Sequence, residues 1–147
     1  MALKVAIASD HGGFELKQKI VELLANLGME YTDFGSGSAD AVDYPDYAFL
    51  VSEKVAAKEY DRGILICGTG VGISIAANKV KGIRCALVHD VFTAKATRQH
   101  NDSNVIAMGG RVIGDELAKM IVKIWLEEDF MGKHHATRIE KIIEYEA

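Results

Sequence analysis

The sequence predicts a single α/β domain, built on a doubly wound sheet of five parallel strands with helices on both faces. Short, nearly continuous apolar runs, typical of strands buried on both faces, alternate with segments whose apolar residues recur every three or four positions. Such alternation implies parallel strands joined by right-handed crossovers. The chain has 147 residues, close to the roughly 150 expected of one domain. We therefore expect residues 1–147 to form one domain.

Each element follows from a local pattern. The predicted strands are the apolar runs at residues 5–8, 29–34, 64–67, 85–88 and 105–108. The first helix carries apolar residues from Leu16 to Leu27 and ends at Gly28, a residue suited to the C′ position. A last helix is predicted over about residues 134–146. The same helical spacing recurs after Pro45 and again late in the chain, at Ala48, Val51, Val55, Leu117, Ile121, Ile124 and Trp125.

Composition and charge exclude several classes of function. The net charge is -4 and Lys and Arg form no run, so we expect no nucleic-acid partner. The longest uncharged stretch, residues 63–78, falls short of the roughly 20 apolar residues of a membrane span. The first residues do not form a signal peptide, so a cytoplasmic protein is expected. Cys67 and Cys85 lack C-x-x-C spacing and are expected to be reduced thiols.

The most informative junction follows the third strand, where Cys67 precedes the loop Gly68, Thr69, Gly70, Val71, Gly72. Glycines let backbone N–H groups turn toward one point and stabilise negative charge. The loop is not a P-loop, because no Lys-Ser/Thr pair follows, and its G-x-G-x-G spacing departs from the dinucleotide fingerprint. Asp90 nevertheless lies about 20 residues on, where that fingerprint places a ribose-binding acid. A nucleotide-binding module therefore remains an alternative.

Cys67 has two interpretations. A cysteine on an apolar strand is usually an inert buried thiol. At the start of a helix and beside a donor-rich loop, however, its thiolate would be stabilised, which suits a general base. We therefore favour a proton-abstracting Cys67, whereas Cys85 has no glycine or basic neighbour and is expected in the core.

Other junctions carry further candidates. Asp10 and His11 follow the first strand and precede two glycines, an arrangement typical of either an anion site or a simple cap by Asp10. His100 is either functional or a surface residue near a helix C-terminus. His134 and Arg138 are four residues apart and would share one helical face, which would hold a phosphate or simply be solvated. The five histidines show no metal-ligand spacing, so no metal is predicted.

Four segments together resemble ribose-5-phosphate isomerase type B, of the family that includes galactose-6-phosphate and allose-6-phosphate isomerases. The resemblance runs end to end and implies a Rossmann-like fold. GTGVGISIAAN, preceded by a strand and a cysteine, is its most specific part. The segments are SDHGGFELK at residues 9–17, DYPDYA at 43–48, GILICGTGVGISIAANK at 63–79 and RQHNDSNV at 98–105.

The resemblance implies interconversion of ribose 5-phosphate and ribulose 5-phosphate through an enediolate, in the pentose phosphate pathway and without a cofactor. It makes Cys67 the base that moves a proton between C1 and C2, and Thr69 the group that assists between O1 and O2. Asp10 and His100 would open the sugar ring. Tyr44, at the end of the long loop 35–45, would form a wall of the substrate pocket.

The family also implies a phosphate site and a partner. Its phosphate-binding positions match His11, Arg111 and Arg138, and a sugar-contacting position matches Asn101. His100 and Asn101 would reach in from the second subunit of a homodimer, which can pair into tetramers, and the last helix would complete the phosphate site or the dimer. His134 stands where many members carry arginine; histidine is charged only below about pH 6.5, so a weaker phosphate grip would admit allose 6-phosphate or free aldoses.

Overall fold

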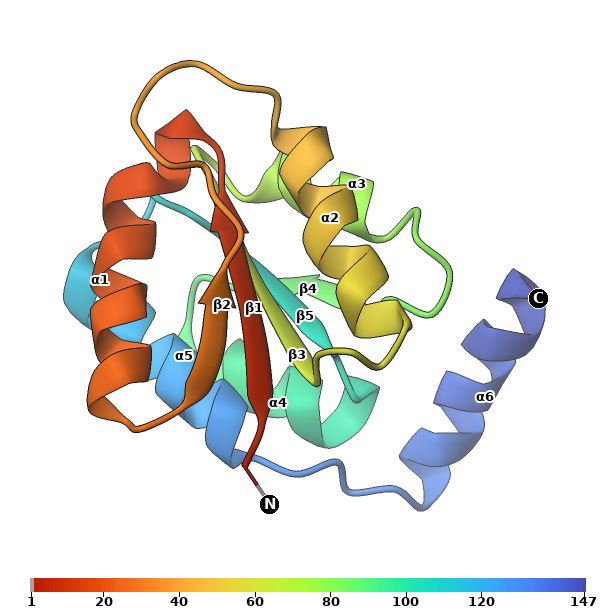
Figure 1. The fold of residues 1–147 in the computed structure, drawn as a ribbon. Coiled ribbons are helices and arrows are strands. Elements are labelled where there is room, and N and C mark those ends of the chain that lie inside the picture. Colours follow the sequence, from red (N-terminus) through yellow and green to blue (C-terminus); the bar gives the residue numbers. More distant parts are fainter. Residues whose placement is uncertain (1) are drawn as a thin grey trace.

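The computed structural model describes residues 2–147 and has the predicted architecture (Figure 1). One sheet contains β1 (Lys4–Ser9), β2 (Glu30–Asp33), β3 (Arg62–Cys67), β4 (Cys85–Leu87) and β5 (Val105–Gly109), all parallel. The α-helices are α1 (Phe14–Asn26), α2 (Tyr44–Ala56), α3 (Val71–Ala77), α4 (Val91–Asn101), α5 (Asp115–Glu127) and α6 (His134–Glu146), and a 3-10 turn, η1 (His11–Gly13), precedes α1. The predicted strands and the last helix are confirmed; β2 and β4 are shorter than predicted.

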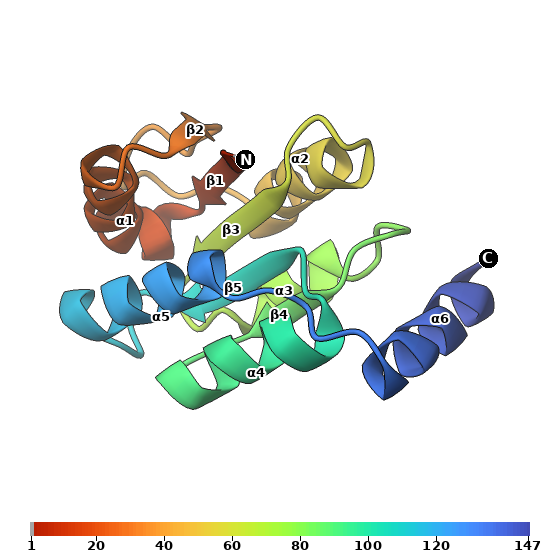
Figure 2. The same cartoon turned by 90° about the horizontal axis from the view of Figure 1, so that it is seen from below.

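The helices form two layers around the sheet. Figure 1 shows the sheet between α1 and α5 on one side and α2 and α3 on the other, and Figure 2 shows α4 beside α5. Alternate residues of each strand supply the two halves of the core: Ile64 and Ile66 face α1 and α5, and Leu65 and Cys67 face α2 and α3. Side chains alternate along a strand, so a continuous apolar run fills both layers.

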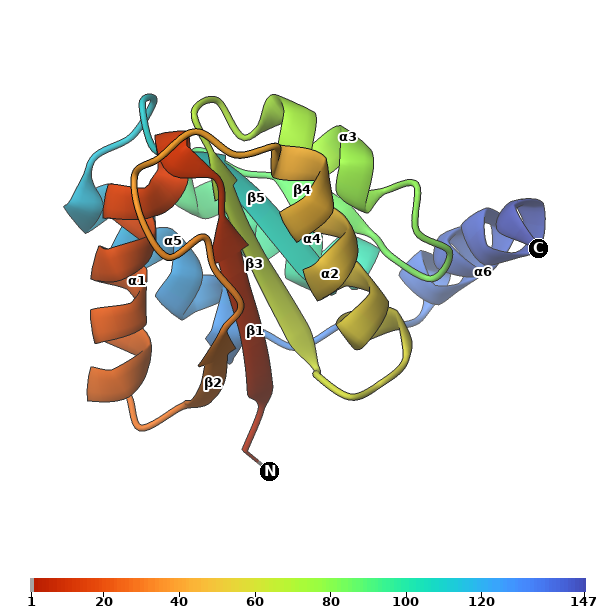
Figure 3. The ribbon, with the colours of Figure 1, turned by 45° about the horizontal axis from the view of Figure 1, so that its top comes forward.

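The strand order is β2-β1-β3-β5-β4. From β1 the chain enters α1 on one face, whereas from β3, the neighbouring strand, it enters α3 on the other face. Ligands of open parallel sheets bind at such a reversal, beyond the carboxyl ends of the strands. Figure 3 brings this edge forward and shows the loop from β2 to α2 crossing the end of β1. The fold therefore points to the ends of β1 and β3.

Helix α6 lies apart from both layers and projects away from the sheet (Figures 1 and 2). Ile139 is its buried residue, while Ile142 and Ile143 are 53% and 47% exposed. A groove of about 360 Å³ lies between this helix and the segment from β4 to α4. Within residues 2–147, no helix has the length and apolar composition needed to cross a membrane.

Candidate active site

Three loops meet at the carboxyl edge of the sheet: residues 10–13 after β1, 67–72 after β3, and 109–111 after β5. Gly110 donates its backbone N–H to the carbonyl of Cys67 at 2.8 Å, and Arg111 donates to the carbonyl of Gly68 at 3.0 Å. A Cβ built on Gly12 would lie 3.0 Å from the backbone nitrogen of Gly68. The loops approach so closely because glycines stand at the contacts.

Cys67 is the last residue of β3, as predicted, and is 4% exposed. The backbone N–H of Gly70 donates to its Sγ at 3.1 Å. Gly70 can turn its N–H back toward the sulfur because it has a left-handed conformation, with φ of +79°. A donor aimed at the sulfur and the start of α3 both stabilise negative charge there. The sulfur of Cys67 is thus held by a backbone donor at the start of α3.

The rest of the loop differs in one respect from the predicted anion cradle. The Oγ1 of Thr69 accepts the N–H of Val71 at 3.2 Å, and Thr69 is exposed. Two of the loop's donors, those of Gly70 and Val71, are thus directed to side chains of the loop itself. Sequence reasoning missed these bonds, because it cannot tell which acceptor lies nearest to a freed N–H. These two bonds fix the side chains of Cys67 and Thr69 relative to the backbone of the loop.

Tyr44 is the first residue of α2 and lies against the same loop. A Cβ built on Gly72 would lie 2.6 Å from the ring carbon Cζ of Tyr44, so only glycine admits the ring at this distance. Tyr44 is 38% exposed and therefore presents part of its ring to solvent. The role of Tyr44 as a wall of the substrate pocket stays a prediction.

A second hollow, of about 220 Å³, adjoins the loop on the α1 side and contains two of the predicted phosphate ligands, His11 and Arg111. His11 accepts the N–H of Val42 through Nδ1 at 3.2 Å, which leaves Nε2 available to donate to a ligand. Arg111 extends its guanidinium over Gly68, where a Cβ would lie 3.1 Å from Nη1. Two cationic or donating side chains and the start of α1 suit a phosphate.

Sequence reasoning missed the other residues around this hollow. They come from η1, from the first turn of α1, from the loop before α2 and from the turn after β5, and none of them was predicted as a ligand. Glu15 brings a carboxylate to the rim. The residues are Gly12, Glu15, Leu16, Ala39 and Gly110.

Asp10 is 6% exposed and accepts the N–H of Gly13 through Oδ1 at 3.1 Å. The capping interpretation is therefore confirmed for η1. One carboxylate oxygen is occupied in this way, so the cap and a role at the crevice do not exclude each other.

Four predicted site residues do not reach this edge within the same chain. His100 and Asn101 end α4, which runs back to the amino ends of the strands, where Gly63 donates to the carbonyl of Asn104. His134 and Arg138 lie on α6. His100 stacks on His135 with ring centroids 4.4 Å apart, and His134 lies 4.0 Å from His135. Partial desolvation and the nearby charges of His134, His100 and Arg138 lower the pKa of His135.

Asp90, the residue behind the nucleotide-binding alternative, caps α4. Its carboxylate accepts the N–H of Thr93 at 2.7 Å, and this bond lowers the pKa of Asp90. Strand β4 ends three residues earlier, at Leu87. The position of Asp90 thus has a structural explanation that requires no ribose.

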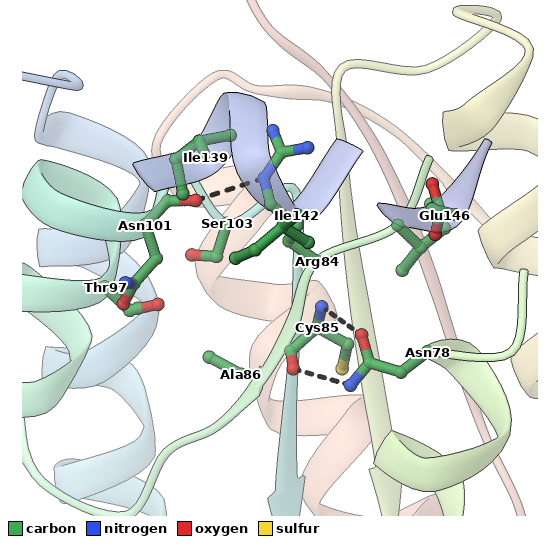
Figure 4. Close-up of a pocket in the computed structure, with 11 residues that line it drawn as sticks. Asn78, Arg84, Cys85, Ala86, Thr97, Asn101, Ser103, Ile139, Ile142 and Glu146 are labelled. Atoms are coloured by element: carbon green, nitrogen blue, oxygen red, sulfur yellow. Dashed lines mark hydrogen bonds between the residues drawn. The ribbon is translucent and has the colours of Figure 1, made fainter. Parts of the chain in front are cut away.

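Cys85 lies far from the crevice, on the edge strand, and packs against the core on the α2 and α3 side. Its N–H and carbonyl bond the side chain of Asn78 at 2.8 and 2.9 Å (Figure 4). Burial raises the pKa of the Cys85 thiol to about 12, so this thiol stays protonated.

Comparison with known proteins agrees with the geometry. The model of the ribose/galactose isomerase family matches residues 5–142. A putative sugar phosphate isomerase of Bacillus subtilis is 63% identical over 98% of this chain and 97% of its own length. Ribose-5-phosphate isomerase B of Escherichia coli is 52% identical over 95% of this chain and 93% of its own.

Solved structures give the same result. Ribose-5-phosphate isomerase B of Clostridium thermocellum superposes with a TM-score of 0.96 at 51% identity, over 98% of this chain and 97% of that one. The Mycoplasma genitalium enzyme with bound ribulose-5-phosphate superposes with a TM-score of 0.95 at 47% identity, over 99% and 97%. With the crevice, the loop after β3 and these likenesses in agreement, the chain belongs to the ribose/galactose isomerase family.

Proposed function

We propose that this chain interconverts ribose 5-phosphate and ribulose 5-phosphate, with Cys67 as the base. The observation that carries the proposal is the buried Sγ of Cys67 at the end of β3, held by the N–H of Gly70 at 3.1 Å. The names of the E. coli and M. genitalium relatives point to the same pair of sugars. We place the reaction in the cytoplasm, where free thiols stay reduced.

The reaction moves one proton between carbons and one between oxygens. The Cys67 thiolate takes the proton from C2 of the open-chain aldose and returns it to C1, while Thr69 passes the hydroxyl proton from O2 to O1. Between these steps the sugar is an enediolate whose oxygen carries negative charge. Preorganised backbone donors stabilise such charge strongly in a site that excludes water. The N–H groups of Gly68, Thr69 and Gly72 are the candidates for this role, because those of Gly70 and Val71 are bonded to Cys67 and Thr69.

The phosphate would occupy the hollow of about 220 Å³ between His11 and Arg111. His11 donates through Nε2, because its Nδ1 is held by Val42. A phosphate held there would fix the sugar beside the loop that begins at Cys67, and fixing the substrate lowers the entropic cost of the reaction.

We further propose that a second copy of the chain completes the site with His100, Asn101, His134 and Arg138. These side chains cannot serve their own Cys67, because α4 carries His100 to the opposite edge of the sheet. The exposed Ile142 and Ile143 of α6 offer an apolar surface for the partner. In the completed site His100 and Asp10 open the sugar ring, Asn101 contacts the sugar, and α6 contributes to the phosphate site.

The first experiment measures turnover of ribose 5-phosphate in excess EDTA, with allose 6-phosphate as a second substrate. Cys67→Ala is expected to fold normally and to lose about 100- to 10,000-fold in kcat, the usual contribution of a general base. Cys85→Ala is the matched control and should retain activity. A fully active Cys67→Ala would overturn the mechanism, and a wild type inactive on both sugars would overturn the function.

A further inference from the structure

His89 supplies a hydrogen bond that β4 no longer provides. The strand ends at Leu87, and its last backbone bond to β5 runs from the N–H of Val88 to the carbonyl of Ala107, at 3.0 Å. Two residues further along β5, the N–H of Gly109 donates instead to Nε2 of His89, at 2.9 Å. Gly109 is buried, so its N–H requires a partner within the protein. The imidazole of His89 therefore extends the ladder by one bond.

The residue held in this way supports the catalytic loop. A Cβ built on Gly109 would lie 2.6 Å from the carbonyl carbon of Thr69, so the two backbones are in direct contact. The next two residues, Gly110 and Arg111, donate to the carbonyls of Cys67 and Gly68. The turn 109–111 thus fixes the loop that begins at Cys67 and also carries Arg111.

We propose that His89 is a positioning residue for the isomerase reaction: by accepting the Gly109 N–H it holds the turn 109–111, and through this turn it holds Cys67, Thr69 and Arg111 in place. The proposal rests on the proposed function for its activity readout. His89 has no part in the chemistry itself, and its effect passes through the backbone of Gly109.

The bond requires the neutral imidazole, with the proton on Nδ1 and the lone pair on Nε2. Partial burial lowers the pKa of His89, against the smaller raising effect of Asp90. Neither β5 nor α3, which pack against β4, bears a titratable side chain, and Arg111 is the charged residue of the turn. Because folding lowers the pKa of His89, the bond is fully formed at any pH above the pKa of His89 in the unfolded chain. It is lost as the pH falls through the pKa of His89 in the folded protein.

The experiment compares two substitutions with the wild type. Gln places an amide oxygen near the position of Nε2 and does not titrate, whereas Leu has similar bulk and no acceptor. We expect His89→Leu to lower kcat/KM for ribose 5-phosphate about 10- to 100-fold, as displacement of a catalytic group does. His89→Gln should stay within a few-fold of the wild type. Asp90→Asn, which retains the cap of α4, is the matched control and should remain active.

Two spectroscopic readouts separate positioning from a loss of the fold. In the wild type, nitrogen NMR of His89 should show an unprotonated Nε2, and the Gly109 amide should exchange slowly and speed up as His89 is protonated. In His89→Gln that amide should exchange slowly at every pH. Equal activity in His89→Leu and wild type, equal losses in Leu and Gln variants, or a protonated Nε2 would overturn the proposal. An inactive wild type would instead count against the proposed function, and leaves the NMR test decisive for the bond.

Discussion

At the scale of single residues, the two cysteines differ only in their surroundings. The Sγ of Cys67 receives the Gly70 N–H at the carboxyl end of β3. The thiol of Cys85 packs against the core, and its desolvation there raises its pKa to about 12. A thiolate forms where a positive dipole or donor compensates its charge, and a buried thiol otherwise stays neutral. One residue type thus serves as the proposed base at one strand end and as core packing at another.

The histidine at position 134 leads to a prediction on substrate affinity. An imidazole reaches a phosphate through one nitrogen, whereas a guanidinium presents its donors in a planar fork that matches phosphate oxygens. If His134 contributes to the phosphate site, His134→Arg should lower KM for ribose 5-phosphate several-fold and leave kcat little changed in steady-state kinetics. An unchanged KM would remove His134 from the phosphate site.

At the scale of elements, the loop between β2 and α2 is held by a buried lysine. Lys17 of α1 is 1% exposed and donates to both carboxylate oxygens of Asp33, at 2.7 and 2.9 Å, and to the carbonyl of Ser36, at 2.8 Å. The loop then continues to Val42, whose N–H holds His11. A helix interior thereby supports a ligand of the proposed phosphate site.

Replacing this lysine tests the support. Lys17→Met removes the ammonium and should lower the free energy of unfolding by about 2 to 4 kcal/mol. The loss is smaller than for a fully buried ion pair, because Asp33 is 32% exposed. KM for ribose 5-phosphate should rise, because the loop between β2 and α2, whose Val42 N–H holds His11, is no longer fixed by Lys17. Urea unfolding and steady-state kinetics measure the two effects. The double variant Lys17→Met/Asp33→Asn should regain part of the stability; if it is no more stable than the single variant, the ion pair is not the cause.

At the scale of the whole molecule, the predicted site residues separate into two groups at opposite edges of the sheet. Asp10, His11, Cys67 and Arg111 lie at the carboxyl edge, and His100 lies at the end of α4 near the amino edge. In a dimer with two-fold symmetry, the group at the carboxyl edge of one chain can meet the group near the amino edge of its partner, and the same contact then forms a second time.

Mixing two inactive variants tests this arrangement. Cys67→Ala and His100→Ala should each be inactive, but chains refolded together should recover about a quarter of the wild-type activity. Random pairing makes half of the dimers mixed, and each mixed dimer has one intact site of two. The control is a sample in which the two variants are refolded separately and mixed only afterwards. No recovery from co-refolded chains would place both residues in the same site of a single chain, or exclude His100 from catalysis.

The sequence by itself determined the local features of this protein. The alternating patterns predicted all five strands and the last helix, and the junction after residue 67 was predicted to place Cys67 at a strand end. These features depend on side-chain periodicity and on the conformations that glycine allows, both of which are set by neighbours in the chain. The family resemblance added the roles of the site residues, which stay predictions until the variants are measured.

Only the tertiary structure decided which junctions meet. The order β2-β1-β3-β5-β4 sets the ends of β1, β3 and β5 side by side, so that His11 and Arg111, a hundred residues apart, line one hollow. The bond from Gly109 to His89 depends on β4 ending early beside β5. No local pattern encodes these contacts, because strand order follows from burying both faces of the sheet at once. The sequence alone thus determined the elements and the chemistry at their ends, and packing decided which ends form the site.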